Sequence, residues 1–178
     1  MEEMKALPVI RGKVWKFGDN ISTTDITPHE MFNWAVSNPR DIVFAAIRPD
    51  WKDMMKPGDC IVVGKNFGFG SHRASANDVM KDLGVGCIVA DSIARIYYRT
   101  SIAIGFPAFP CPGVSDMFDE GNELELDVQR GIVRNLTTGR TIEGNPYPPP
   151  LLEILAAGGI MPLVVERVRK MRDEQTER

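Results

Sequence analysis

The chain has 178 residues, of which 43% are hydrophobic and 25% are charged. This length suits a single domain with a sizeable core, and the apolar runs are far too short to cross a bilayer, so we expect no membrane segment. The net charge of -3 comes with no basic block, which makes nucleic acid a poor partner. A secretion signal begins with basic residues followed by an apolar run, whereas residues 1–5 are mainly acidic. We therefore expect no secretion signal and a cytoplasmic protein.

Cysteine and histidine are too sparse to build a metal site. The three cysteines, Cys60, Cys87 and Cys111, lie more than twenty residues apart, and the two histidines are His29 and His72. Neither a zinc site nor an iron-sulfur site can be assembled from this set, so we expect no metal bound by this chain. Each cysteine lies in an apolar run, which predicts buried thiols.

The first third of the chain predicts one strand followed by irregular structure. Residues 9–17 alternate loosely between apolar and polar and end at a Gly-Asp-Asn turn, which is typical of a strand. Residues 23–57 contain several prolines and scattered aromatic residues, which favours short helices and loops packed on the domain.

Strands and helices are predicted to alternate through the middle third. A short buried strand at 60–63 leads into a glycine-rich loop, a helix over 73–83 follows, and a second buried strand lies at 87–90. A further helix is predicted over 92–105, and its inward face is expected to consist of Ile93, Ile96, Tyr97 and Ile104. This alternation predicts a parallel α/β layer.

The last third changes pattern. Strict alternation over 123–128, followed across a tight turn by 131–136, predicts an antiparallel hairpin with one exposed face. A short helix is expected over 151–157, closed by two glycines. Residues 167–178 are almost wholly charged, so we expect a domain of residues 1–166 and a tail, 167–178, that frays into solvent.

The sequence Gly-Lys-Asn-Phe-Gly-Phe-Gly-Ser-His-Arg at residues 64–73 is the strongest indication of function. Glycines allow positive φ and let a ligand approach bare backbone amides, as at Gly70, and the first turn of a helix offers unpaired N–H groups to an anion. Ser71 is placed to act on a bound carboxylic acid, and Arg73 to hold it by two hydrogen bonds. The alternative for Ser71 is a plain helix N-cap.

Four ordered segments of the chain resemble the small subunit of 3-isopropylmalate dehydratase, which corresponds to the swivelling domain of aconitase. Residues 64–73 are similar to the family loop G-x-N-F-G-x-G-S-S-R, and the other matching segments are 12–21, 88–99 and 135–139 with 151–155. The resemblance implies an α/β swivel domain with three β/β/α layers, a mixed and partly parallel sheet and a C-terminal hairpin.

The resemblance also implies a hydro-lyase in two parts. A large subunit would bind a four-iron four-sulfur cluster, and the small subunit, with no cofactor of its own, would close over it in a heterodimer or heterotetramer. The reaction would remove and re-add water on a hydroxydicarboxylate, most simply 3-isopropylmalate in leucine biosynthesis. By motif position, Ser71 would be the base and Arg73 the carboxylate clamp. Alternatives are homoaconitase, a dimethylmalate or methylmalate dehydratase, or a regulatory domain without catalysis.

The chain departs from the family motif beside the serine. His72 replaces a second serine, and Ala74 replaces the usual glutamate. His72 would bind substrate, tune the charge of the serine, or face away. The loss of the glutamate means that another group must orient the arginine.

Two further segments are candidate parts of the site. Thr24 and Asp25 match the family's threonine-aspartate segment with a one-residue shift, and would lie at the edge of the active site or serve only a local turn. The family's specificity loop would contain Met31, Phe32, Asn33 and Trp34. Its apolar residues favour an alkyl substituent over a third carboxylate, although they would equally suit the core.

Arg95 and Arg99 also match the family motif and lie four residues apart, on one face of the predicted helix. A structural role, in which they pair with neighbouring carboxylates or carbonyls, is favoured over contact with substrate.

Overall fold

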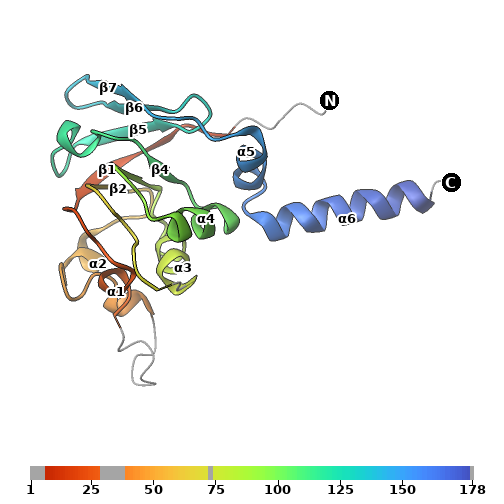
Figure 1. The fold of residues 1–178 in the computed structure, drawn as a ribbon, viewed down its shortest axis with the longest axis horizontal. Coiled ribbons are helices and arrows are strands. Elements are labelled where there is room, and N and C mark those ends of the chain that lie inside the picture. The colour runs from red at the N-terminus through yellow and green to blue at the C-terminus, as the bar shows by residue number, and fades with distance from the viewer. Residues whose placement is uncertain (1–6, 29–38, 72–73, 177–178) are drawn as a thin grey trace.

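The computed structural model describes residues 7–28, 39–71 and 74–176, and its main element is a seven-stranded mixed sheet (Figure 1). The strands are β1 (Ile10–Lys16), β2 (Cys60–Val63), β3 (Cys87–Ala90), β4 (Ala108–Pro110), β5 (Glu123–Asp127), β6 (Ile132–Asn135) and β7 (Thr141–Glu143). The α-helices are α1 (Thr23–Ile26), α2 (Trp51–Met54), α3 (Ala74–Asp82), α4 (Arg95–Ala103), α5 (Pro149–Ala156) and α6 (Ile160–Thr176), with 3-10 turns η2 (Pro39–Ile42) and η3 (Ser115–Met117).

The sheet has a parallel half and an antiparallel half that meet at β1. The strand order is β4-β3-β2-β1-β5-β6-β7. β1 to β4 pair in parallel, with Val14 opposite Cys60, whereas β5 runs antiparallel to β1, with Ile10 opposite Leu126. The predicted mixed, partly parallel sheet and the hairpin of β5 and β6 are therefore confirmed.

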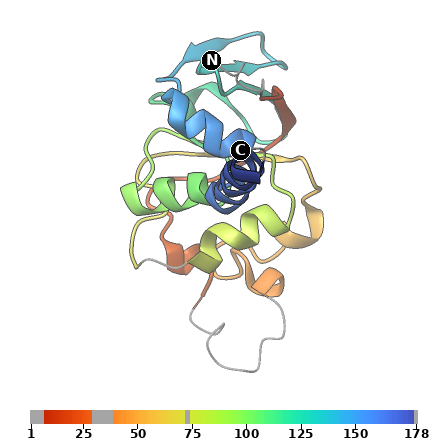
Figure 2. The same ribbon diagram turned by 90° about the vertical axis from the view of Figure 1, so that its right-hand side faces the viewer.

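Two apolar clusters lie on opposite faces of the parallel strands. Alternate side chains of a strand point to opposite faces, so Cys60 and Val62 join one cluster while Ile61 and Val63 join the other. All four residues of β2 are completely buried, as expected for a strand of a parallel sheet covered on both faces. Figure 2 shows helices α3 and α4 side by side, on the side of the molecule from which α6 projects.

The predicted buried thiols are confirmed. Cys60, Cys87 and Cys111 are free and have no exposed surface. Cys60 lies opposite Cys87 in the pairing of β2 with β3. The hydrogen bond with Cys60, together with burial, raises the pKa of the Cys87 thiol, and burial raises the pKa of Cys111 to about 11. Among the described residues no group of three or more His, Cys, Asp or Glu side chains is arranged to hold a metal ion.

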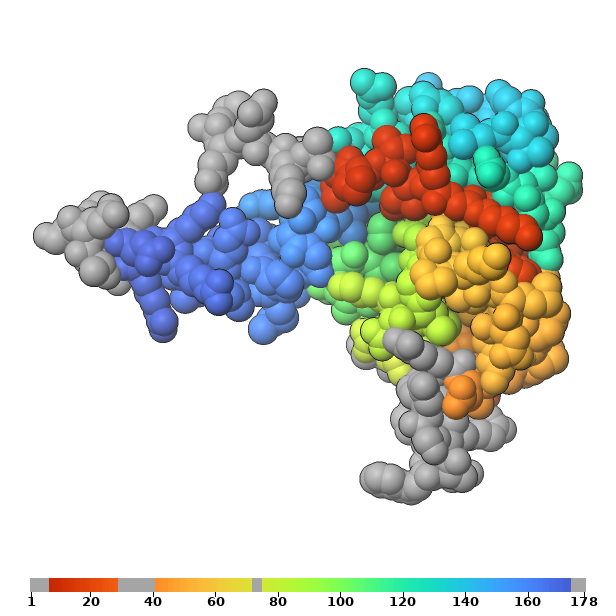
Figure 3. Space-filling model, turned by 180° about the vertical axis from the view of Figure 1, so that it is seen from behind, coloured from red at the N-terminus to blue at the C-terminus, as the bar shows by residue number. Residues whose placement is uncertain are grey.

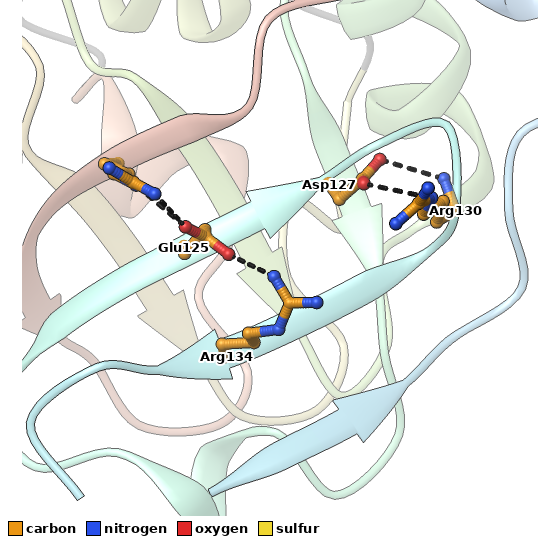
Figure 4. Close-up of polar contacts among 5 residues, drawn as sticks. Glu125, Asp127, Arg130 and Arg134 are labelled. Atoms are coloured by element: carbon orange, nitrogen blue, oxygen red, sulfur yellow. Dashed lines mark hydrogen bonds and ion pairs between the residues drawn. The ribbon is translucent and has the colours of Figure 1, made fainter. Parts of the chain in front are cut away.

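One buried carboxylate stabilises the antiparallel half (Figure 4). The side chain of Glu125 on β5 is only 6% exposed and accepts hydrogen bonds from Arg11 on β1 and Arg134 on β6. The hydrogen bond from Arg134, followed in strength by the one from Arg11, holds the pKa of Glu125 below its usual range. At the end of β5, Asp127 accepts a hydrogen bond of 3.0 Å from the backbone N–H of Arg130, in the turn that follows. The three strands are thus cross-linked by ion pairs on one face.

Two predictions from the sequence need correction. Ile96 was expected to face inward with Tyr97, but Ile96 is 48% exposed, whereas Tyr97 is buried. Residues 167–176 were expected to fray, but they continue helix α6, where Glu166 and Lys170 form an i, i+4 ion pair. The domain boundary predicted between residues 166 and 167 falls inside this helix. Within the described ranges, no helix is long and apolar enough to span a bilayer.

Candidate active site

The glycine-rich loop between β2 and α3 has a backbone that requires glycine at Gly68. The φ angle there is +73°, and a Cβ atom would lie 2.4 Å from the ring of Tyr97. The ring itself is packed edge-on against Phe67, with ring centroids 5.0 Å apart. The loop therefore lies directly on the side chain of Tyr97, and any larger residue at position 68 would push it outward.

The start of the loop is tied to the turn after β1. The backbone N–H of Lys65 donates to Asp19 Oδ1 at 2.7 Å, and Asn66 donates from its side chain to Asn20 at 3.0 Å. The N–H of Asn66 also donates to Ser92 Oγ at 2.8 Å. These bonds fix the loop to two neighbouring segments before it reaches the serine.

Ser71 lies at the exposed end of this loop. Its backbone carbonyl accepts a hydrogen bond of 3.1 Å from the hydroxyl of Thr23, which is itself 96% buried. The serine forms the rim of a small surface depression whose other lining residues are Thr23, Gly68, Gly70, Asn77, Ile96 and Tyr97. Ser71 and Gly70 are thus presented to solvent and not to the core, as an active-site serine requires.

The floor of the depression is a buried polar network between α3 and α4. The side-chain amide of Asn77 donates to the carbonyl of Tyr97 at 3.1 Å and to Ser101 Oγ at 2.6 Å. The hydroxyl of Tyr97 donates to the carbonyl of Ala76 at 3.2 Å, and burial raises the pKa of Tyr97 well above its usual value. Tyr97 remains a neutral phenol that joins both the loop and α3.

Thr24 and Asp25 lie in α1, whose first turn is closed by a capping box. The carboxylate of Asp25 accepts hydrogen bonds from the backbone N–H and the hydroxyl of Ser22, at 2.7 and 2.6 Å. This is the local role that the sequence left open as the alternative for Asp25. The side chain that reaches the serine loop is Thr23, and the backbone N–H of Thr23 also donates to the carbonyl of Phe69 at 2.8 Å.

Several candidate residues lie outside the described part of the chain. These are the clamp Arg73, its neighbour His72, and the predicted specificity loop of Met31, Phe32, Asn33 and Trp34. Their roles stay predictions.

Arg95 and Arg99 differ from expectation. Both are exposed on α4, and neither forms an ion pair with a described residue. The structural pairing expected for them is therefore not seen in this part of the chain. Arg95 directly precedes Ile96, which lines the depression beside Ser71.

Three comparisons with known proteins identify the family. The model of the aconitase C-terminal domain matches residues 16–107. The small subunit of isopropylmalate/citramalate isomerase from Methanocaldococcus jannaschii is 41% identical over 163 residues, which cover 90% of this chain and 96% of that protein. The chain belongs to the family of 3-isopropylmalate dehydratase small subunits.

Other members of this small-subunit family agree in sequence and in structure. Small subunit 1 of 3-isopropylmalate dehydratase from Thermotoga maritima is 45% identical over 156 residues, covering 86% of this chain and 93% of the relative. The crystal structure of 3-isopropylmalate dehydratase (LeuD) from M. jannaschii superimposes with a TM-score of 0.86 and 29% identity, over 94% of this chain and 99% of that one. The swivel-domain fold and the family read from the sequence are confirmed.

Two residues that line the depression beside Ser71, Thr23 and Asn77, were not among the predicted site residues. Thr23 had a weak signal, since it directly precedes the threonine-aspartate pair that was singled out. Asn77 gave no such signal, because a polar residue on the second turn of a predicted helix does not reveal that it will be 98% buried between two helices.

Proposed function

We propose that this chain is the small subunit of a heteromeric iron-sulfur hydro-lyase that isomerises an alkyl-substituted malate, in first place 3-isopropylmalate and 2-isopropylmalate in leucine biosynthesis. The observation that carries the proposal is the near full-length match to small subunits of that name, together with an exposed Ser71 in the family's loop. The partner is a large subunit, and the complex works in the cytoplasm.

Ser71 is the proposed base. It takes a proton from a carbon of the substrate while the hydroxyl group on the neighbouring carbon leaves, and it returns the proton when water is added in the opposite sense. A serine oxygen holds negative charge only in a positive potential. In this chain, such a potential would come from the backbone N–H groups at the start of α3 and from Arg73. The Thr23 hydroxyl fixes the backbone of Ser71, which positions its side chain at the rim of the depression.

Arg73 is the proposed clamp for a substrate carboxylate, and Gly70 lets that carboxylate approach the backbone closely. His72 is proposed to contact the same substrate or the serine. Thr24 and Asp25 are proposed at the edge of the site, where Asp25 acts through the capping box that holds Thr23 in place.

The iron-sulfur cluster is assigned to the large subunit. The three cysteines of this chain are completely buried, with Cys60 and Cys87 in contact on β2 and β3 and Cys111 directly after β4, so they cannot reach a cluster at the serine loop. When bound in the partner, the cluster supplies a Lewis acid for the leaving hydroxyl group.

The alkyl group of the substrate is proposed to pack against the loop of Met31, Phe32, Asn33 and Trp34. No arginine occurs between Gly12 and Pro39 to bind a third carboxylate. The name of the M. jannaschii relative couples isopropylmalate with citramalate, and both are malates that carry an alkyl substituent. An alkylmalate is therefore favoured over homocitrate.

The test is anaerobic co-purification with the large subunit, followed by turnover assays on a panel of alkylmalates, homocitrate and citrate. We expect turnover with an alkylmalate, and its abolition by Ser71→Ala while the complex still assembles. Thr138→Ala, in the turn before β7 and far from the serine loop, is the matched control and should leave turnover unchanged. An assembled complex that is inactive on every substrate would favour a regulatory domain, and turnover retained by Ser71→Ala would remove Ser71 from the base role.

A further inference from the structure

One apolar side chain at the depression beside Ser71 has no role in the function proposed above. Ile96, on the first turn of α4, is 48% exposed and lines this depression together with Ser71. Exposure alone would not be informative, because single apolar residues are common on protein surfaces. The position of Ile96 beside the candidate base is what calls for an explanation.

The orientation of Ile96 is fixed by its neighbour Tyr97. With 3.6 residues per turn, successive side chains of a helix point about 100° apart. The ring of Tyr97 is buried against Phe67, and its hydroxyl donates to the carbonyl of Ala76 on α3 at 3.2 Å. Asn77 of α3 also donates to the carbonyl of Tyr97, at 3.1 Å. The first turn of α4 is thus held to α3 at two points, so Ile96 cannot turn inward to bury its side chain.

The serine loop and the start of α4 form one unit. The backbone N–H of Ala94 donates to the carbonyl of Phe67 at 2.8 Å, and the N–H of Phe67 donates to the carbonyl of Ser92 at 3.0 Å. These bonds pair the loop with the segment that leads into α4. The position of Ile96 relative to Ser71 is therefore set by backbone hydrogen bonds.

The lining of the depression combines polar and apolar groups. Ser71, Thr23 and Gly70 contribute hydroxyl and backbone groups. Ile96 contributes the one large aliphatic side chain among the described lining residues. A malate with an alkyl substituent has the same two parts, since its carboxylates bind to polar groups and its hydrocarbon group gains free energy on leaving water.

We propose that Ile96 contacts the alkyl substituent of the substrate and so selects malates with a branched substituent over those with a methyl group. The inference rests on the proposed function, and it adds a specificity-determining residue that lies outside the loop of residues 31–34.

The expected effect follows from the size of the substituent. One methylene group in an apolar pocket changes kcat/KM by roughly 10- to 200-fold, and isopropyl has more carbon atoms than methyl. Ile96 covers only one side of the substituent. Ile96→Ala should therefore lower the ratio of kcat/KM for 3-isopropylmalate to kcat/KM for 3-methylmalate by about tenfold. Ile96→Val keeps a branched side chain and should retain most of this ratio.

The experiment measures this ratio in the complex assembled anaerobically with the large subunit. Leu136→Ala is the matched control, because Leu136 is 43% exposed, close to the value of Ile96, but directly follows β6. Figures 1 and 3 show the antiparallel strands, coloured cyan, and helix α3, coloured yellow-green, on opposite sides of β1. The control should leave kcat/KM unchanged for both malates.

A tenfold fall in the ratio for Ile96→Ala, with Ile96→Val close to the native chain, supports the inference. An equal fall in kcat/KM for both malates overturns it, because the effect would then be a general one on the site. Subunit affinity, measured by isothermal titration calorimetry, tests the other explanation, in which Ile96 contacts the large subunit. Weaker assembly with an unchanged ratio overturns the inference in favour of that contact.

Failure of this inference is distinguishable from failure of the proposed function. A native complex that is inactive on both malates overturns the proposed function and the role of Ile96 with it. Native turnover with an unchanged ratio in Ile96→Ala overturns the role of Ile96 alone.

Discussion

The glycine at position 68 offers a test of how the serine loop is held. In Gly68→Ala the new Cβ would lie 2.4 Å from the Tyr97 ring, in a backbone with φ of +73°. The left-handed conformation costs an alanine about 1–2 kcal/mol, and overpacking a tight contact costs about 1–3 kcal/mol more. We therefore expect Gly68→Ala to lower the free energy of unfolding by about 2–5 kcal/mol.

A matched control separates these two contributions. Gly139, in the turn before β7, has a φ of +75° but no atom within 4 Å of an added Cβ. Gly139→Ala should therefore cost only the conformational part, about 1–2 kcal/mol. Urea unfolding of the two variants, followed by tryptophan fluorescence, measures the difference. If both variants lose the same stability, contact with Tyr97 is not what requires glycine at position 68 of the loop.

Three further outcomes are expected. Tyr97→Phe removes only the hydroxyl group that donates to the carbonyl of Ala76, so urea unfolding should show that the free energy of unfolding falls by about 1 kcal/mol. A fall near zero would mean that this hydrogen bond adds nothing to the link between α4 and α3. Glu125 has a lowered pKa in the folded chain, so its stabilisation is complete above the unfolded pKa of about 4.3 and disappears as the pH falls through the folded pKa. Glu125→Gln should therefore be less stable than the native chain at pH 7 and nearly equal to it at pH 2, and an equal gap at both values would contradict the ion pairs of Glu125. Finally, an Ellman assay should find almost no reactive thiol in the folded chain and three after unfolding. All three thiols are buried, the hydrogen bond with Cys60 and burial raise the pKa of Cys87, and burial raises the pKa of Cys111. Fast reaction of the folded chain would show that the thiols are accessible.

The elements with regular periodicity were predictable from the sequence. The buried runs at β2 and β3 and the alternation in β5 indicate strands because apolar spacing directly reflects which faces are covered. The family motif placed Ser71, and the structure shows it exposed. Its proposed role as base stays a prediction.

The remaining features depend on contacts between distant segments. Ile96 fits a helical apolar face, but its side chain reaches the depression beside the serine loop, and no local pattern reveals that the loop lies there. Asn77 is buried because α3 packs against α4, and its partners Tyr97 and Ser101 lie 20 and 24 residues later in the chain. The charged end of the chain predicted a tail because residues 166–174 are mostly charged, whereas the structure continues helix α6 to Thr176.

The position of β1 at the junction of the two halves of the sheet has a consequence for synthesis of the chain. Arg11 on β1 bonds to Glu125 on β5, a residue 114 positions later, so the first strand to leave the ribosome must wait for one translated many seconds afterwards. Until then one edge of β1 is an unpaired template for other nascent chains. On overexpression, the protein should therefore form most inclusion bodies when translation stalls before residue 123. A lower growth temperature will not remove the exposed edge of β1.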